Sequence, residues 1–302
     1  MDTFSVLPRP KKALFVRFLV TGLCFLLSLS FAQVTNLNDS GAGSLRQEIL
    51  DANDGDTITF QAGLSGTINL ASGEIEIDEN DLTIDVAGAT IAVDGQNNSR
   101  IFRHTGTGTL AINNLTIQNG NAGGNGGGIF SNSNVILTDS TVFGNSASVQ
   151  GGGIWSNGDL ALTDSMVSEN NALSNDGGGI WSNGNITVTN STVSGNNASD
   201  DGGGIWSNSN TIFINSLASG NIANGSIVDG VGGGIGSIGD VTLVNSIVSG
   251  NNSDRGGGIW SFVSVFLTNS LVLGNDAPTN PQILGTVTLT NGAYGFGVGE
   301  ST

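Results

Sequence analysis

The sequence contains almost no cysteine, histidine or lysine. It has one Cys, one His and eight Lys plus Arg residues against 25 Asp plus Glu, for a formal net charge of −17. This shortage of basic residues excludes nucleic-acid binding, which needs a positively charged surface. A single cysteine cannot form an intramolecular disulfide, so packing must hold the fold together. The 48 glycines do not recur at every third position, which excludes a collagen triple helix.

The N-terminal segment differs in composition from the rest of the chain. Four basic residues precede an apolar run from Phe18 to Phe31, and small residues stand at Ser30 and Ala32. This pattern predicts a secretory signal peptide, residues 1–32, that is cleaved before Gln33; an uncleaved membrane anchor is the alternative. Cleavage removes four of the eight basic residues and one of the 25 acidic residues, which leaves a net charge of −20.

The motif Gly-Gly-Gly-Ile recurs six times at intervals of 24 to 30 residues. Within each repeat, Ser, Asp or Asn, Ser again and finally Asn follow the first glycine at fixed distances. All variation in length lies between that last Asn and the next triplet, so each unit has a rigid frame and one variable corner loop. A period in this range is typical of a solenoid. The repeats begin at Gly126, Gly151, Gly177, Gly202, Gly232 and Gly256.

Short β-prone runs separated by Gly or Asn fill each frame, and helix formers are scarce. About 25 residues with three short strands and three corners predict one coil of a parallel β-helix. Three apolar columns, which begin at Ile129, Leu137 and Val142, are expected to point inward and form one continuous core. The Asn column from Asn145 to Asn275 is expected to form a ladder of amides that bond coil to coil.

Less regular coils are expected before this array. The segment from Ser44 to Asn53 predicts a helix, because Ser44 and Gln47 form a capping box and Leu45 and Ile49 share one face. We interpret this helix as the cap that covers the open end of the solenoid. The candidate strands of the irregular coils are Thr57–Phe60, Thr67–Leu70, Glu74–Ile77, Leu82–Val86, Thr90–Val93 and Ala111–Ile117.

These boundaries predict a single domain, residues 33–302, after the signal peptide 1–32. The domain divides into an N-terminal cap (34–56), irregular coils (57–125), six regular coils (126–275) and a C-terminal coil (276–302). Together they make roughly ten or eleven coils.

The repeats resemble those of a known group of proteins. The stretch Gly-Gly-Gly-Ile-Trp-Ser-Asn and the later Thr189–Asn196 are similar to the repeats of bacterial secreted right-handed parallel β-helix proteins, with polymorphic outer-membrane-protein-like repeats nearest. The opening from Val34 to Asn53 and the tail Asn280–Gly297 resemble the ends of such proteins. The resemblance implies a secreted or surface protein of the pectin-lyase-like fold. It differs from the autotransporter members in that no membrane barrel follows the tail.

The same fold hosts polysaccharide lyases and hydrolases, so we searched for catalytic groups. A lyase needs a base close to carboxylates, and the array offers only Arg255 beside Asp254, which we interpret as a surface ion pair. A hydrolase needs paired carboxylates. Asp139 and Asp164 are stacked in adjacent coils, but their column continues as Asn, which indicates a turn position. We therefore predict no catalytic residue.

Two further sets of polar residues have both a functional and a structural interpretation. His104 is either a substrate-contacting residue beside two arginines or an ordinary surface histidine, and we favour the latter. The acidic residues Glu74, Glu76, Asp78, Glu79, Asp81 and Asp85 are expected to form a solvated face.

A row of aromatic residues is the main candidate binding surface. The aromatic residue lies between an inward Ile and an inward Ser, so it should point outward and offer a ring to a sugar or a partner, or cover the fold's own surface. Only Gly236 interrupts the row. We predict ligand binding by Phe130, Trp155, Trp181, Trp206 and Trp260.

The variable corner loops carry the other candidate feature. Asp176, Asp200, Asp201, Asp229 and Asp254 lie there, and their oxygens suit calcium, but the nine-residue calcium-binding repeat is absent and we favour solubility as their role. We expect no resident metal or cofactor, with calcium as the exception to test.

The sequence therefore predicts a secreted or cell-surface binding or structural protein, with an adhesin as one form of it. Its partner would be a polysaccharide or a cell-surface ligand and not nucleic acid. We expect a monomer without a membrane span in the mature chain. A polysaccharide lyase or glycoside hydrolase of the pectin-lyase-like fold is the alternative.

Overall fold

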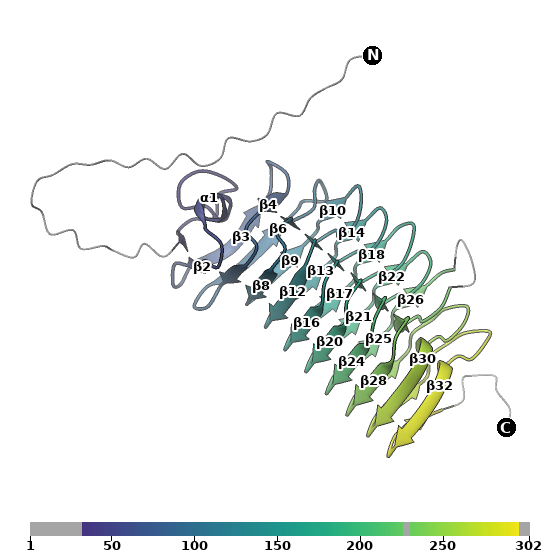
Figure 1. Ribbon diagram of the computed structural model, residues 1–302. Coiled ribbons are helices and arrows are strands. Elements are labelled where there is room, and N and C mark those ends of the chain that lie inside the picture. Colours follow the sequence, from purple (N-terminus) through teal and green to yellow (C-terminus); the bar gives the residue numbers. More distant parts are fainter. Residues whose placement is uncertain (1–31, 226–229, 296–302) are drawn as a thin grey trace, which may run out of the picture. The chain divides into compact units, whose positions relative to one another are not determined.

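The computed structural model describes residues 32–225 and 230–295, so the predicted signal peptide up to Phe31 lies outside the described residues. The described chain is a right-handed parallel β-helix, as expected (Figure 1). One of its sheets has ten strands, one from each coil, which confirms the expected number of coils. All described strand pairs are parallel, and equivalent residues of successive coils are in register; Ile129, for example, pairs with Ile154.

Three strands of each regular coil build the three walls of the solenoid. The first and second walls belong to one 18-stranded sheet, and the third wall is the ten-stranded sheet. The first wall consists of β4 (Ile75–Ile77), β7 (Phe102–His104), β11 (Ile129–Ser131), β15 (Ile154–Ser156), β19 (Ile180–Ser182), β23 (Ile205–Ser207) and β27 (Ile235–Ser237).

The second and third walls follow in the same way. The second wall consists of β1 (Gln33–Val34), β2 (Thr57–Phe60), β5 (Leu82–Asp85), β8 (Thr109–Asn113), β12 (Asn134–Thr138), β16 (Leu160–Thr163), β20 (Ile186–Thr189), β24 (Thr211–Ile214) and β28 (Val241–Val244). The third wall consists of β3 (Ser65–Asn69), β6 (Thr90–Asp94), β9 (Leu115–Gln118), β13 (Thr141–Phe143), β17 (Met166–Ser168), β21 (Thr192–Ser194), β25 (Leu217–Ser219), β29 (Ile247–Ser249), β31 (Leu271–Leu273) and β33 (Ala293–Tyr294).

Two strands run through both the first and the second wall. These are β30 (Ile259–Thr268) and β32 (Ile283–Thr290). In earlier coils a turn sequence such as Asn157-Gly158 separates the two walls, whereas the same corner in β30 reads Phe262-Val263. Residues with high β propensity replace turn formers there, so the strand continues without a break.

A short fourth sheet was not expected from the sequence. It has five strands of two residues each, β10 (Asn121–Ala122), β14 (Ser146–Ala147), β18 (Asn171–Ala172), β22 (Asn197–Ala198) and β26 (Ile222–Ala223). It lies just after the Asn ladder, where each coil turns towards its variable loop.

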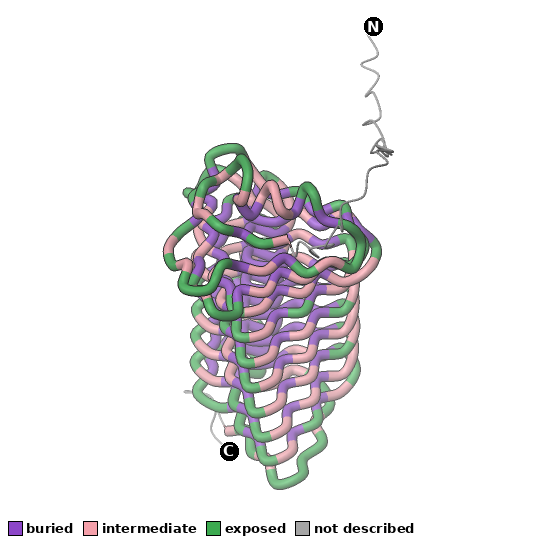
Figure 2. The backbone as a smooth tube through the Cα atoms, turned by 90° about the vertical axis from the view of Figure 1, so that its left-hand side faces the viewer, coloured by how far each residue is buried: buried purple, intermediate pink, exposed green. Residues whose placement is uncertain are grey.

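The three expected apolar columns are buried and form the core. The columns that begin at Ile129, Leu137 and Val142 are at most 1% exposed throughout the six regular coils. Figure 2 shows that buried positions recur at the same place in successive coils. Most outward positions between them are intermediate or exposed, which follows from the two-residue period of a strand; the outward Trp181 and Trp206 are exceptions, because their neighbours cover them.

The corner between the second and third walls turns at one residue with a positive φ. Asp139, Asp164, Asn190, Asn215, Asn245 and Asn269 all have φ between 49° and 51°. Asp and Asn tolerate this left-handed conformation better than other side chains do. The structure thus confirms that the Asp139 and Asp164 column is a turn position, and it also explains why Ala111–Ile117 forms two strands: Asn114, with φ 58°, separates β8 from β9.

The Asn ladder is buried and continuous. Asn196 shows the pattern: its backbone N–H and its Nδ2 both donate to Oδ1 of Asn221, at 3.0 and 2.9 Å, and its Nδ2 also donates to the carbonyl of Val167. The ladder ends at Gln282, whose Oε1 accepts from both donors of Asn275. The side chains therefore satisfy backbone groups that would otherwise be buried without partners.

The N-terminal cap has the expected form. Helix α1 (Leu45–Asp51) begins after Ser44, whose Oγ accepts a hydrogen bond from the Gln47 N–H at 3.2 Å. Leu45 and Ile49 are buried, whereas Leu50 is 61% exposed. The helix packs on β1, β2 and β4 and covers the first coil.

Candidate functional site

The aromatic row lies along the outside of the first wall, one ring per coil. The pattern of buried Ile and Ser around each ring confirms that the aromatic side chain points outward. Phe130 stacks on Trp155 with a centroid distance of 4.7 Å and an interplanar angle of 5°, and Trp155 stacks on Trp181 at 5.2 Å and 3°. The rings therefore pack face to face along the solenoid axis.

The row continues across the coil that lacks an aromatic residue. Trp206 and Trp260 stack at 5.4 Å and 9°, although the coil of Gly236 lies between their strands. A Cβ at Gly236 would lie 2.5 Å from Cε3 of Trp206, so only glycine leaves room for this indole. The interruption seen in the sequence is thus what allows the two indoles to meet.

This packing limits how the row can contact a ligand. Trp181 and Trp206 are 9% and 8% exposed, and they form a cluster with Val231. The ring of Phe130 has Trp155 on one side and the guanidinium of Arg100 on the other, 5.2 Å from the centroid. Stacking on a sugar requires a free ring face, and neighbours cover both faces of Phe130 and Trp155. Ligand binding by the five aromatic residues stays a prediction. At Phe130 and Trp155 it would have to use the ring edges, and Trp260 is the third half-buried ring of the row.

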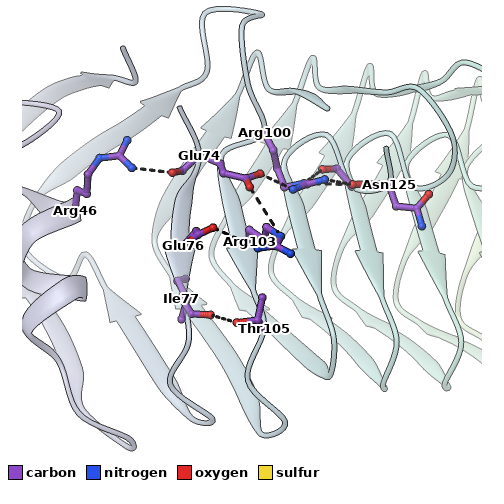
Figure 3. A network of polar contacts seen from close by, with 9 residues as sticks. Arg46, Glu74, Glu76, Ile77, Arg100, Arg103, Thr105 and Asn125 are labelled. Carbon is purple, nitrogen blue, oxygen red and sulfur yellow. Dashed lines mark hydrogen bonds and ion pairs between the residues drawn. The ribbon is translucent and has the colours of Figure 1, made fainter. Parts of the chain in front are cut away.

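A cluster of charged residues continues the row towards the N-terminal end. Glu76, Arg103 and Phe130 are in register on β4, β7 and β11. Glu74 pairs with Arg100, and Arg103 lies between Glu74, at 3.9 Å, and Glu76, at 3.3 Å (Figure 3).

Hydrogen bonds anchor two of the arginines of this cluster to the backbone. Arg100 donates to the carbonyls of Asn125 and Gly126, and Arg46 donates to those of Gly73 and Glu74. Arg103, with its side chain 41% exposed, is the one of the three that remains accessible.

The acidic residues of this region do not form a uniformly solvated face, as the sequence had suggested. Glu74 and Glu76 are tied to the arginines, and Glu79 is 9% exposed. This pairing was not predictable, because the coils before Gly126 lack the triplet that sets the register.

His104 is not a surface residue, and this corrects the expectation from the sequence. It is fully buried in the first wall, in register with Ser131. Its Nδ1 lies 2.8 Å from Oγ of Ser131, and its Nε2 lies 3.0 Å from the Glu79 carbonyl, so Nε2 carries the hydrogen and donates. Burial lowers the pKa of His104, which keeps the ring neutral. The residue takes the place of a serine in the corner column and does not contact solvent.

The expected surface pair between Asp254 and Arg255 does not form. The Asp254 carboxylate accepts a hydrogen bond from the Gly230 N–H at 3.1 Å, and no ion pair joins it to Arg255 within the described residues. Adjacency in sequence was therefore a poor guide to contact at this corner.

A groove lies outside the second wall, next to the aromatic row. It has a volume of about 450 Å³ and follows β8, β12, β16, β20 and β24. Outward aliphatic and threonine side chains, such as Ile136 and Thr187, line it together with the polar side chains of Asn134, Asp159 and Asn185. These polar residues bond from coil to coil: Asn134 Oδ1 accepts from the Asp159 N–H, and Asp159 Oδ1 accepts from the Asn185 N–H. Sequence reasoning missed the groove, because its existence depends on how the outer side chains pack.

The most perturbed carboxyls lie in the variable corner loops. Asp176 and Asp201 occupy equivalent positions in adjacent coils, and Asp176 Oδ1 accepts from the Asp201 N–H at 3.4 Å. Burial raises the pKa of Asp201 to about 7, and the neighbouring charges of Asp176 and Asp200 add to the rise. Burial also raises the pKa of Asp176. The Asp201 carboxyl is therefore poised to exchange a proton near neutral pH.

Asp201 should make stability depend on pH. Because the folded state holds this proton more tightly than the unfolded chain does, stability should fall as the pH rises from about 4 to about 7. We expect Asp201→Asn to raise Tm at pH 8 and to leave it nearly unchanged at pH 4, since Asn keeps the acceptor for the Val231 N–H, 2.8 Å away. Thermal unfolding of both proteins across this pH range provides the measurement. An equal change of Tm at both ends of the range would contradict the assignment.

The described residues contain neither a cluster of metal-binding side chains nor a membrane-spanning helix. In residues 32–225 and 230–295, no group of three or more His, Cys, Asp or Glu residues is arranged to hold a metal ion. Asp229, one of the corner-loop acids, lies outside this range. No helix in the same ranges is long and apolar enough to cross a membrane.

Comparison with known proteins identifies the fold. No family model and no curated protein matches the chain. A solved structure described as that of pectate lyase Pel9A is similar, with a TM-score of 0.54 and 15% sequence identity over 91% of this chain and 81% of that chain. At this identity the likeness establishes a shared parallel β-helix and nothing about activity.

Proposed function

We propose that this chain is a secreted or cell-surface binding protein that holds a linear polysaccharide in the groove outside the second wall. The single observation that carries this proposal is the groove itself, which extends over five coils and has a volume of about 450 Å³. Surface presentation as an adhesin is one form of this role. The predicted signal peptide supports export.

The chemistry of the groove suits a sugar chain. Sugars have apolar C–H faces and polar hydroxyl rims, and the groove offers aliphatic side chains beside a column of amides and a carboxylate. Coils repeat at about 4.8 Å, so equivalent groups recur along the groove as they do along a polymer. The edge of Trp155, on the adjacent wall beside the groove, would widen the contact, and that of Trp260, two coils beyond the end of the groove, would lengthen it.

A variant that fills the groove tests this proposal. Thr187→Arg places a long side chain in the groove, whereas Thr192→Arg makes the same change on the outer side of the third wall of the same coil. We expect retention on at least one polysaccharide from a panel of neutral and acidic chains, and we expect Thr187→Arg to abolish it while Thr192→Arg does not. Circular dichroism checks that both variants fold. Equal retention of the two would exclude the groove.

The aromatic edges need a separate variant. Trp155→Ala and Trp260→Ala remove half-buried rings and leave in place the more deeply buried Trp181 and Trp206, which form the cluster with Val231. A contribution to binding predicts weaker retention for these variants, and unchanged retention would remove the row from the binding surface.

Cleavage of a polysaccharide is the second candidate function. It is favoured by the raised pKa of Asp201 beside Asp176, because a carboxyl that titrates near pH 7 suits general acid–base catalysis. The fold neighbour is described as a pectate lyase. New chain ends in the panel experiment, with and without calcium, that disappear in Asp201→Asn would replace the binding proposal by this one.

A further inference from the structure

The C-terminal end of the solenoid differs from the N-terminal end in that nothing described covers its core. Leu289 continues the column of Leu267, and Tyr294 continues that of Val272. Leu267 and Val272 are 1% and 0% exposed, whereas Leu289 and Tyr294 are 46% and 49% exposed. Strand β32 pairs with β30 on one edge, and no described strand pairs with its other edge. Helix α1 covers the opposite end.

Exposed apolar side chains gather in the last coils. They lie at the corner of β30, on its outer face, on the third wall and at the open end. Between residues 259 and 295 the exposed large apolar residues are Phe262, Val263, Phe266, Leu271, Leu273, Leu289 and Tyr294. A concentration of exposed apolar side chains at one end of a molecule favours an interaction site there.

The same region carries almost no charge. Between Gly256 and Gly295 the sole charged residue is Asp276. The chain as a whole has a formal net charge of −17, so two copies repel each other over most of their surface. Contact between two C-terminal ends keeps the acidic coils of both copies far apart.

We propose that two copies of this chain associate tail to tail, with β32 of one copy pairing antiparallel to β32 of the other about a two-fold axis through Val287. An edge strand without charge or proline is a ready template for a further strand. In antiparallel pairs, residues directly opposite lie on the same face. With the axis at Val287, Gly285 lies opposite Leu289, and Thr286 lies opposite Thr288.

This register matches the sequence of the strand. The inward positions Gly285, Val287 and Leu289 of both copies join the two open cores, and the small Gly285 makes room for Leu289 of the other copy. The outward threonines then form two equivalent cross-strand pairs. A two-fold contact of this type is closed, so it gives a dimer and no longer assembly. It replaces the monomer that the sequence suggested.

Two double variants of the full-length chain test both the interface and its register. In Thr286→Lys/Thr288→Lys, like charges face each other across the axis, whereas in Thr286→Lys/Thr288→Glu each lysine faces a glutamate. Both positions are exposed, so neither pair disturbs the core. We expect a dimer for the unmodified chain, at least about tenfold weaker dimerisation for the Lys/Lys variant, and recovery for the Lys/Glu variant. Analytical ultracentrifugation over a range of concentrations measures this.

A matched control places two lysines on the same wall away from the end. Thr242→Lys/Val244→Lys lies on β28, and Thr242 is two coils before Thr288 in the same column. We expect this variant to dimerise like the unmodified chain. A monomer at all concentrations would overturn the proposal, and so would a dimer that all three variants leave unchanged. Binding of a monomer to neutral phosphatidylcholine vesicles, lost in the Lys/Lys variant, would instead assign the apolar end to a lipid surface.

Discussion

Replacing Gly178 by alanine is expected to destabilise the solenoid by about 4 kcal/mol or more, and so to prevent a complete array from forming. A Cβ at this position would lie 2.3 Å from the carbonyl oxygen of Gly203 and 2.4 Å from the carbonyl carbon of Asn197. Both atoms belong to the backbone of neighbouring segments, which are fixed by the ladder and by strand pairing, so they cannot move aside. Chemical denaturation followed by circular dichroism gives the free energy of unfolding.

Gly178 is required because no space is left for a side chain, and not because its backbone conformation needs glycine. Gly178 does not have a positive φ, in contrast to Gly177, whose φ is +69°. Gly124→Ala is the matched control, because no atom lies within 4 Å of its added Cβ and its φ is also ordinary. We expect its stability to be unchanged or slightly raised, since alanine restricts the unfolded chain. If the two variants were equally stable, close approach of the coils would not be the function of the triplet.

Asn196→Ala is expected to lower the free energy of unfolding by about 3 kcal/mol. The change leaves the Asn170 N–H, which donates to Asn196 Oδ1 at 3.0 Å, and the Val167 carbonyl without their partners. Asn196 is 0% exposed, so water cannot replace the lost bonds. Each buried polar group that loses its partner costs about 1–3 kcal/mol. The fall in free energy of unfolding, measured by denaturation, checks the value.

Asn197→Ala provides the comparison on the adjacent residue. Its side chain is half-buried and bonds only to other amide side chains: Nδ2 donates to Asn171 Oδ1 at 3.1 Å, and Oδ1 accepts from Asn224 Nδ2 at 2.6 Å. We expect Asn197→Ala to lower the free energy of unfolding by about 1 kcal/mol or less. A similar cost for both replacements would mean that the ladder adds no more to stability than an ordinary surface amide.

The regular coils could be predicted from the sequence because every structural demand recurs there. The column of Ile129, the turn position of Asp139 and the ladder position of Asn145 are each occupied by the same kind of residue in every repeat. Repetition thus separates what the fold requires from what varies. The helix after Ser44 was predictable for a different reason, since its capping signal is local.

The register of the irregular coils and the contacts of the surface side chains could not be predicted in the same way. Without a glycine triplet before Gly126, nothing in the sequence aligns Arg103 with Phe130 or His104 with Ser131. The outward direction of the tryptophans followed from alternation, but their stacking depends on side-chain rotation, which alternation does not determine. Gly236 illustrates the limit: it reads as a gap in the row, whereas it is the position over which Trp206 leans towards Trp260.

The Asn ladder also bears on how such a chain can change during evolution. Each ladder Asn presents the same acceptor to the coil before it and the same donors to the coil after it, so a whole coil can be duplicated or deleted by recombination and the new neighbours still match. Variation in loop length is confined to one corner and does not disturb this match. The terminal residue Gln282 stays in place whatever the number of coils. The length of the array should therefore change by whole coils, and natural variants should differ by complete coils more often than by parts of one.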